Sequence, residues 1–135
     1  MKEATGRARV LALKTERVMR LVRAREGVLA GSLYIARTRC GRKACKCMTS
    51  DYRHQNWCLS FYQSGKSRTR TVPDELVATV RDLTGKHREV KGLRRGMAKV
   101  AREILETVDG VIAKAAEVGQ KNLLKSLAEK KGGGT

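Results

Sequence analysis

The chain has 135 residues and a net charge of +17 at pH 7, with 30 Lys or Arg against 13 Asp or Glu. It contains no apolar run near the roughly 20 residues that span a bilayer, and its first residues lack the apolar stretch of a signal peptide. The sequence therefore argues against a membrane protein and a secreted protein, and we expect a cytoplasmic or nucleoid-associated one.

Residues 1–27 are predicted to form a basic N-terminal helix, running from about Glu3 to Glu26. Its apolar residues recur at steps of three and four, the period of an amphipathic helix: Val10, Leu11, Val18, Leu21 and Val22. Glycines at positions 27 and 31 mark its end. Arg17 and Arg20 on this helix are candidate contacts for the phosphates of a nucleic acid.

Residues 28–72 are predicted to form a small β module. It contains three predicted strands, at residues 32–39, 56–63 and 67–72. Alternation with a period of two places Trp57, Leu59 and Phe61 on one face of the second strand. A turn at residues 64–66 joins the second strand to the third. We therefore expect a three-stranded antiparallel meander.

Residues 73–130 are predicted to form a C-terminal helical region. Pro73 precedes two acidic residues, which is typical of a helix start. Apolar residues continue at steps of three and four from Leu76 to Val111, which predicts one long helix or a helical hairpin broken near residues 85–96. A final short helix is expected around Leu123, Leu124 and Leu127, and a disordered tail at residues 131–135.

Three cysteines, Cys40, Cys45 and Cys47, lie within eight residues after the first predicted strand. In a reducing compartment such a cluster indicates a metal site rather than disulfides, and its spacing is one residue short of the plant-type iron–sulfur run. Zinc takes four tetrahedral sulfur or nitrogen ligands, so a fourth is needed. His54, in a polar loop, is favoured over Cys58, which lies within a strand, but both remain candidates. We expect a zinc knuckle with a structural Zn2+.

Together these elements predict an α+β fold: an N-terminal helix, a small three-stranded antiparallel sheet with a zinc knuckle, then a long C-terminal helix or helical hairpin. Positive charge is concentrated in residues 27–72, where nine Lys or Arg accompany one acid, Asp51. One or two of these cations would offset the charge of metal-bound thiolates. The remainder favour a phosphate backbone, because neutralised phosphates release their counterions.

We therefore expect a nucleic-acid partner, and the sequence does not distinguish DNA from RNA. The candidate contacts are Arg37, Arg39, Arg42, Lys43, Lys46, Arg53, Lys66, Arg68 and Arg70, together with Arg17 and Arg20 of the N-terminal helix.

Several short runs resemble a family of small prokaryotic proteins of unknown function. The runs are Gly-Ser-Leu-Tyr at 31–34, Cys-Gly-Arg at 40–42, Cys-Lys-Cys at 45–47, His54, an aromatic strand, and Val-Pro at 72–73. The resemblance covers about Gly31 to Leu83 and implies Cys40, Cys45, Cys47 and His54 as the metal ligands. The chain departs from the family pattern at Gln55-Asn56, where Gly-Pro is usual, and at Cys58, where an aromatic residue is usual.

The sequence carries no recognisable catalytic constellation. It has no glycine-rich phosphate loop and no nucleophile elbow, and a metal-dependent nuclease would need clustered carboxylates. His87 falls on the apolar stripe of the C-terminal helix and is expected in the core. We expect a nucleic-acid-binding accessory protein rather than an enzyme, for example a subunit of a nucleoprotein or mobile-element complex, with no small-molecule substrate and no membrane partner. The alternative is an assembly protein whose C-terminal helices oligomerise or recruit a protein partner.

Overall fold

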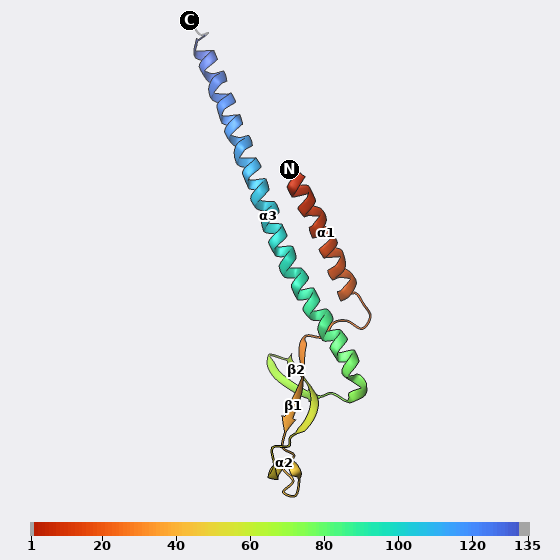
Figure 1. Cartoon of the computed structure of the whole chain (residues 1–135). Helices are drawn as coiled ribbons and strands as arrows, with labels where there is room; N and C mark the ends of the chain where they lie inside the picture. Colours follow the sequence, from red (N-terminus) through yellow and green to blue (C-terminus); the bar gives the residue numbers. More distant parts are fainter. Residues whose placement is uncertain (1, 133–135) are drawn as a thin grey trace. The chain divides into compact units, whose positions relative to one another are not determined.

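The computed structural model describes residues 2–132 and confirms the predicted α+β class (Figure 1). Its elements, in chain order, are α1 (Lys2–Val22), β1 (Gly31–Thr38), α2 (Lys46–Thr49), β2 (His54–Gln63), β3 (Lys66–Thr71) and α3 (Asp74–Gly132). Contacts divide the chain into two units, residues 1–16 with 94–135 and residues 17–93. None of the helices in the described range is long and apolar enough to cross a membrane.

The three strands form an antiparallel sheet in the order β1-β2-β3, as predicted. Their bounds lie within two residues of the predicted ones, and the main difference is that β2 begins at His54 rather than at Asn56. Ser64 and Gly65 join β2 to β3 with φ angles of 53° and 77°. Two positive φ angles in a two-residue loop match the twist of the flanking strands, so this turn sets the register of the hairpin.

The core lies on one face of the sheet, against the first turns of α3. The face with Trp57, Leu59 and Phe61 packs there, as the alternation predicted. Leu59, Val72 and Val77 are buried, and five partly buried side chains surround them: Leu29, Leu33, Trp57, Phe61 and Val80. The guanidinium of Arg81 lies 5.2 Å from the centre of the Trp57 ring. Such a cation over an indole face is attracted by its quadrupole.

Helix α3 is a single helix of 59 residues, which settles the choice between one helix and a hairpin. Gly85, Gly92 and Gly96 do not break it, because a glycine inside a helix costs only about 1 kcal/mol relative to alanine. The expected short final helix is its last part. Lys131 and Gly132, expected in a tail, are helical, and residues 133–135 lie outside the described residues.

Helix α1 ends at Val22, four residues earlier than predicted, and Gly27 follows with a φ of 71°. Within residues 17–93, Leu21 is buried and Arg17 Nε donates to Glu89 Oε1 at 2.9 Å. Within the other unit, Ala4 is buried and Arg7 Nε lies 3.2 Å from Glu103 Oε2. In each unit an ion pair therefore links its part of α1 to α3.

The N-terminal end of β1 is held close to α3 and to β2. The backbone N–H of Leu29 donates to the carbonyl of Leu83 at 3.1 Å. A Cβ on Gly31 would lie 2.8 Å from the Ser60 carbonyl oxygen and 2.9 Å from Leu59 Cδ1. Glycine is therefore required at this position by close approach of backbone to backbone.

We expect Gly31→Ala to destabilise residues 17–93 by about 1–3 kcal/mol, because the added methyl group must displace the β2 backbone or the Leu59 side chain. Gly92→Ala is the matched control. No atom lies within 4 Å of the Cβ that it adds, so it should stabilise α3 by about 0.5–1 kcal/mol. Urea unfolding followed by circular dichroism measures both changes. Equal stability of Gly31→Ala and the wild type would contradict the close approach.

Candidate metal centre

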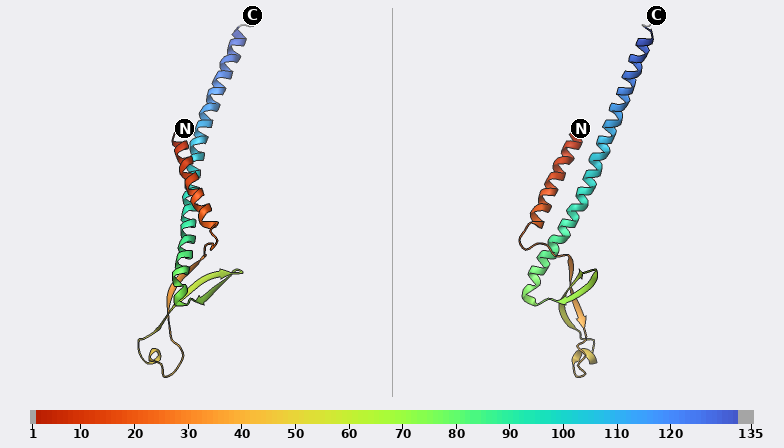
Figure 2. Two further views of the ribbon diagram at one scale, coloured as in Figure 1. Left: turned by 90° about the vertical axis from the view of Figure 1, so that its right-hand side faces the viewer. Right: turned by 180° about the vertical axis from the view of Figure 1, so that it is seen from behind.

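The cysteine cluster lies in the segment that connects β1 to β2, at the opposite end of that strand pair from Gly31 (Figure 2). Gly41 has a φ of 79°, a left-handed backbone conformation that glycine adopts without the steric penalty of a side chain. The backbone N–H of Cys45 donates to the Arg42 carbonyl at 3.0 Å and closes a tight turn. Cys45 occupies the N-cap position of the short helix α2, without a side-chain capping hydrogen bond; this helix was not predicted from the sequence.

This folding brings three thiols and one imidazole together. The ligand atoms of Cys40, Cys45, Cys47 and His54 all lie within 4.8 Å of one another. Cys40 Sγ and Cys47 Sγ are 3.5 Å apart, and Cys45 Sγ lies 3.2 Å from His54 Nε2. In a tetrahedral site with bonds of about 2.3 Å to sulfur, ligand atoms are about 3.8 Å apart. The four residues could therefore hold a metal ion after movements of about 1 Å or less.

His54, rather than Cys58, is the fourth member of this cluster. It is the first residue of β2 and pairs with Thr38, so it lies in a strand and not in the polar loop that was expected. Cys58 lies four residues further along β2, about 13 Å away at the rise of a strand. It is 8% exposed and pairs with Tyr34 and Thr71. The ligand set implied by the family resemblance is the one that the chain brings together.

Two residues between Cys47 and His54 hold this segment in place. Arg53 Nη1 donates to the carbonyl oxygens of Cys47, Ser50 and Tyr52, at 3.0, 3.0 and 2.7 Å. The Tyr52 ring meets the His54 imidazole edge-on, with centroids 5.5 Å apart. Sequence reasoning missed both roles and assigned Arg53 to phosphate contacts. The sequence offered one indication of the role of Arg53, which is that it lies between two metal-ligand candidates in a short loop. A guanidinium in such a loop can donate hydrogen bonds to several backbone carbonyls at once.

The thiols of Cys40 and Cys47 differ in pKa although they belong to one cluster. The backbone N–H of Cys40 donates to Cys47 Sγ at 3.4 Å and lowers the pKa of Cys47 to about 7. The pKa of Cys40 is raised instead: the backbone N–H of Arg42 lowers it, but the hydrogen bond with Cys45, partial burial and the hydrogen bond with Cys47 together outweigh that effect. Cys47, which is fully buried, is therefore the thiol best prepared to act as a thiolate ligand.

The predicted phosphate contacts fall into several environments. Around the cysteine cluster, Arg39, Arg42 and Lys43 are exposed, whereas Lys46 has its ammonium 5.6 Å from the Tyr52 ring centre. Arg17 forms an ion pair with Glu89. Three cations, Lys66, Arg68 and Arg70, are exposed on β3, and Arg37 is exposed on β1. Arg20 is exposed on α1.

The cross-strand register shows which face of the sheet the β3 arginines occupy. Arg70 pairs with Leu59 and Arg68 pairs with Phe61, and cross-strand partners point to the same face. Both arginines therefore project on the core face, at its exposed margin. The opposite face carries tyrosine, serine and threonine side chains instead: Ser32, Tyr34, Tyr62, Ser67 and Thr69.

If the cluster holds a structural metal, replacing one ligand should release it and loosen the segment around it, because the binding energy of such a metal is folding energy. We expect about one metal ion per wild-type chain and a large loss of metal in Cys45→Ser. Cys58→Ala is the matched control and should keep the metal. Elemental analysis after desalting measures the metal, and amide exchange of residues 39–54 measures the loosening. Retention of metal by Cys45→Ser, or its loss from Cys58→Ala, would contradict this ligand set.

Comparison with curated proteins and with solved structures returned no match for the chain. Comparison with family models returned a domain of unknown function, DUF6788, which matches residues 12–82. The matched range contains β1, α2, β2, β3 and all four residues of the cysteine–histidine cluster. It covers more than half of the sequence, and the chain therefore belongs to the DUF6788 family.

Proposed function

We propose that the metal held by Cys40, Cys45, Cys47 and His54 is a structural zinc ion. Three thiolates and one imidazole are a common donor set for structural zinc, and they fill all four tetrahedral positions. No position is then left for water or a substrate, so the ion would act on folding and not on chemistry. The position of the four residues, after β1 and at the start of β2, supports this role.

We further propose that the protein is a nucleic-acid-binding accessory protein and not an enzyme. One observation carries the proposal: of the nine Lys and Arg in residues 27–72, eight are exposed, and these residues contain a single acid, Asp51. In the part of the chain that the structure describes, none of the nine forms an ion pair. Unpaired cations held on a folded module attract phosphates and release counterions.

The zinc ion and the cations would act together. A metal-anchored loop keeps Arg39, Arg42 and Lys43 at defined positions, whereas an unanchored loop would have to order itself on binding, at an entropic cost. The exposed β3 cations provide a second contact region. A rigid module of this kind suits a subunit of a nucleoprotein, including one that belongs to a mobile element.

The salt dependence of binding tests the β3 cations. We expect Arg68→Ala combined with Arg70→Ala to weaken nucleic-acid binding and to reduce the slope of log affinity against log salt by about 0.7–0.9 per lost phosphate contact. Lys114→Ala with Lys125→Ala removes the same charge from the exposed C-terminal part of α3 and should leave the slope nearly unchanged. Equal slopes for the wild type and the β3 variant would exclude these arginines as phosphate contacts.

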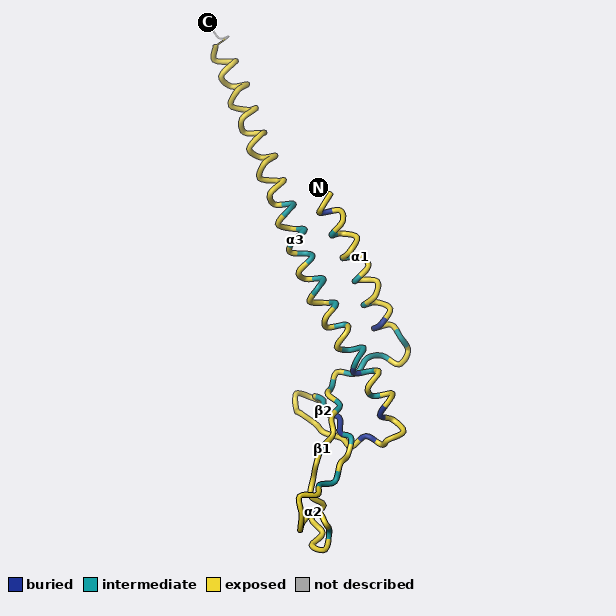
Figure 3. The backbone as a smooth tube through the Cα atoms, viewed as in Figure 1, coloured by how far each residue is buried: buried dark blue, intermediate teal, exposed yellow. Residues whose placement is uncertain are grey.

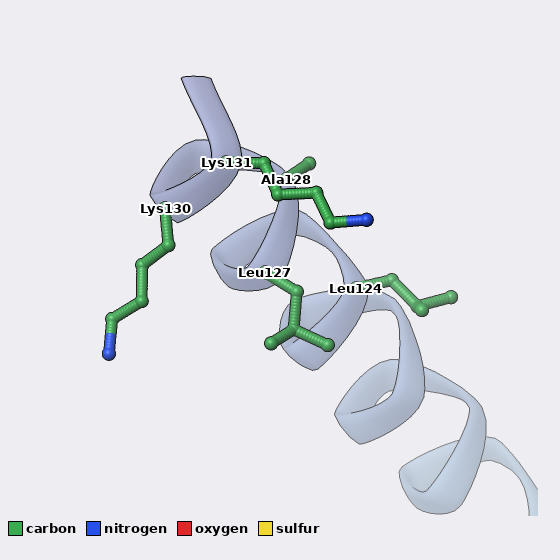
Figure 4. Close-up of a pocket in the computed structure, with 5 residues that line it drawn as sticks. All are labelled: Leu124, Leu127, Ala128, Lys130 and Lys131. Carbon is green, nitrogen blue, oxygen red and sulfur yellow. The ribbon is translucent and has the colours of Figure 1, made fainter. Parts of the chain in front are cut away.

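A second function, assembly through α3, is favoured by the exposure of its last part. Large apolar side chains there are half exposed or more, including Ile112, Val118, Leu123, Leu124 and Leu127. The backbone of this part of α3 is coloured as exposed in Figure 3. Leu124 and Leu127 project from the helix near Lys130 and Lys131 (Figure 4). Apolar residues that recur along one helix are typical of a helix that packs against a partner helix.

If the chain self-associates through this segment, Leu123→Glu with Leu127→Glu should shift it to the monomer, because charges cannot be buried unpaired at low cost. Gln120→Glu with Asn122→Glu adds the same charge at neighbouring polar positions and should leave the association state unchanged. Light scattering coupled to size exclusion at high salt measures the molar mass. A wild-type chain that is monomeric at all concentrations would rule out self-association.

A further inference from the structure

A hollow of about 350 Å³ lies between α3 and the end of the sheet opposite the cysteine cluster. The start of β1 and the end of β2 form one wall. The other wall is the face of α3 that carries His87, Arg88 and Lys91. The contact of Leu29 with Leu83 fixes the two walls together. His87, expected in the core, is half-buried at this wall instead. The volume is in the range of sites that take a small ligand.

The charge around this hollow is positive and uncompensated. The two acids nearest in sequence are already paired: Asp82 with Lys86 at 3.1 Å and Glu89 with Arg17 at 2.9 Å. Arg88 and Lys91 are exposed and form no ion pair with any described residue. Arg68, the cross-strand partner of Phe61, carries a further positive charge at this end of the sheet. An anion entering the hollow would meet no carboxylate in its lining.

The same hollow is lined by aromatic and hydroxyl-bearing residues. Tyr62, which lines it, is 80% exposed. Phe61, Ser32 and Ser60 are further lining residues. An aromatic ring left in water next to cations is the usual platform for an unstacked base, and each stacked base contributes about 1–3 kcal/mol. The bases of a duplex are already stacked and hide their faces, so this chemistry favours a single strand.

We propose that this hollow is a nucleotide subsite for single-stranded nucleic acid. Arg88 and Lys91 bind a backbone phosphate, and the ring of Tyr62 stacks on the adjoining base. The inference rests on the proposed nucleic-acid binding and makes it specific, since it names the strand type and the residues that select it. Phosphate and base must be recognised together, which separates this subsite from the general positive charge of the module.

The test compares a 12-nucleotide single strand, as RNA and as DNA, with a duplex of the same sequence and with a mononucleotide. Binding to the zinc-loaded full chain is measured by fluorescence anisotropy over a range of salt concentrations. Tyr62→Ala should weaken single-strand binding about 5- to 100-fold and leave the salt slope and duplex binding unchanged, while Tyr62→Phe should bind as the wild type does.

Charge variants test the phosphate contact. Arg88→Gln with Lys91→Gln should weaken single-strand binding and lower the salt slope by about 0.7 per lost contact. Lys99→Gln with Arg102→Gln is the matched control, because it removes two exposed cations at the same spacing on the same helix. Circular dichroism and metal content confirm that each variant folds. Photocrosslinking of a 4-thiouridine strand to the unmodified protein should place adducts at residues 61–62.

The outcomes are distinct. Unchanged single-strand binding by Tyr62→Ala, or adducts confined to other segments, would overturn the subsite while leaving nucleic-acid binding intact. Equal losses for single strand and duplex would show that the groups serve a duplex, and mononucleotide binding as tight as that of the 12-mer would show a site for free nucleotide. Either result overturns the proposal. If the wild type binds none of these strands, the proposed nucleic-acid-binding function itself is wrong.

Discussion

Three side chains, Leu59, Val72 and Val77, are the buried centre of the contact between the sheet and α3. A core of this size secures only the strand residues that pack against it. The segment between β1 and β2 lies beyond it and has Cys47 as its buried residue in the described range. Small modules of this kind usually need a metal or a disulfide in addition to their apolar core. The cysteine–histidine cluster supplies the means of holding this second end of the module.

The sequence allowed the class of the fold, the order of its elements and the face of β2 that enters the core to be predicted, because alternation and helical periodicity directly report burial. It did not decide whether α3 is one helix, since a glycine weakens a helix without indicating where it ends. The short helix α2 has too few residues to show a period. For the metal cluster, three ligands were clear from spacing, whereas the choice between His54 and Cys58 depended on how far β2 extends, which is a property of strand pairing with Thr38.

Several cations that look equivalent in the sequence have different physical roles. Arg53 satisfies three backbone carbonyls, Arg81 covers the Trp57 ring, and Arg17 is paired with Glu89. Composition cannot separate such residues from those, like Arg68 and Arg88, that have no acidic partner in the described chain. The high net charge therefore overstates the number of cations free to meet a polyanion. Within residues 27–93, exposed cations without an ion pair lie near the cluster, on β3 and at Arg88 and Lys91 of α3.

The β1–β2 ladder sets the distance between the cysteine cluster and the hollow. It contains eight residue pairs, from Gly31 with Phe61 to Thr38 with His54, and spans about 23 Å at the rise of a strand. Inserting one residue into either strand would turn every side chain beyond it to the opposite face and move Trp57 or Leu33 out of the core. The separation of the two ends can therefore change only by two residues at a time, in steps of about 7 Å. The distance between the two ends of the ladder therefore depends on the same alternation of side chains that forms the core.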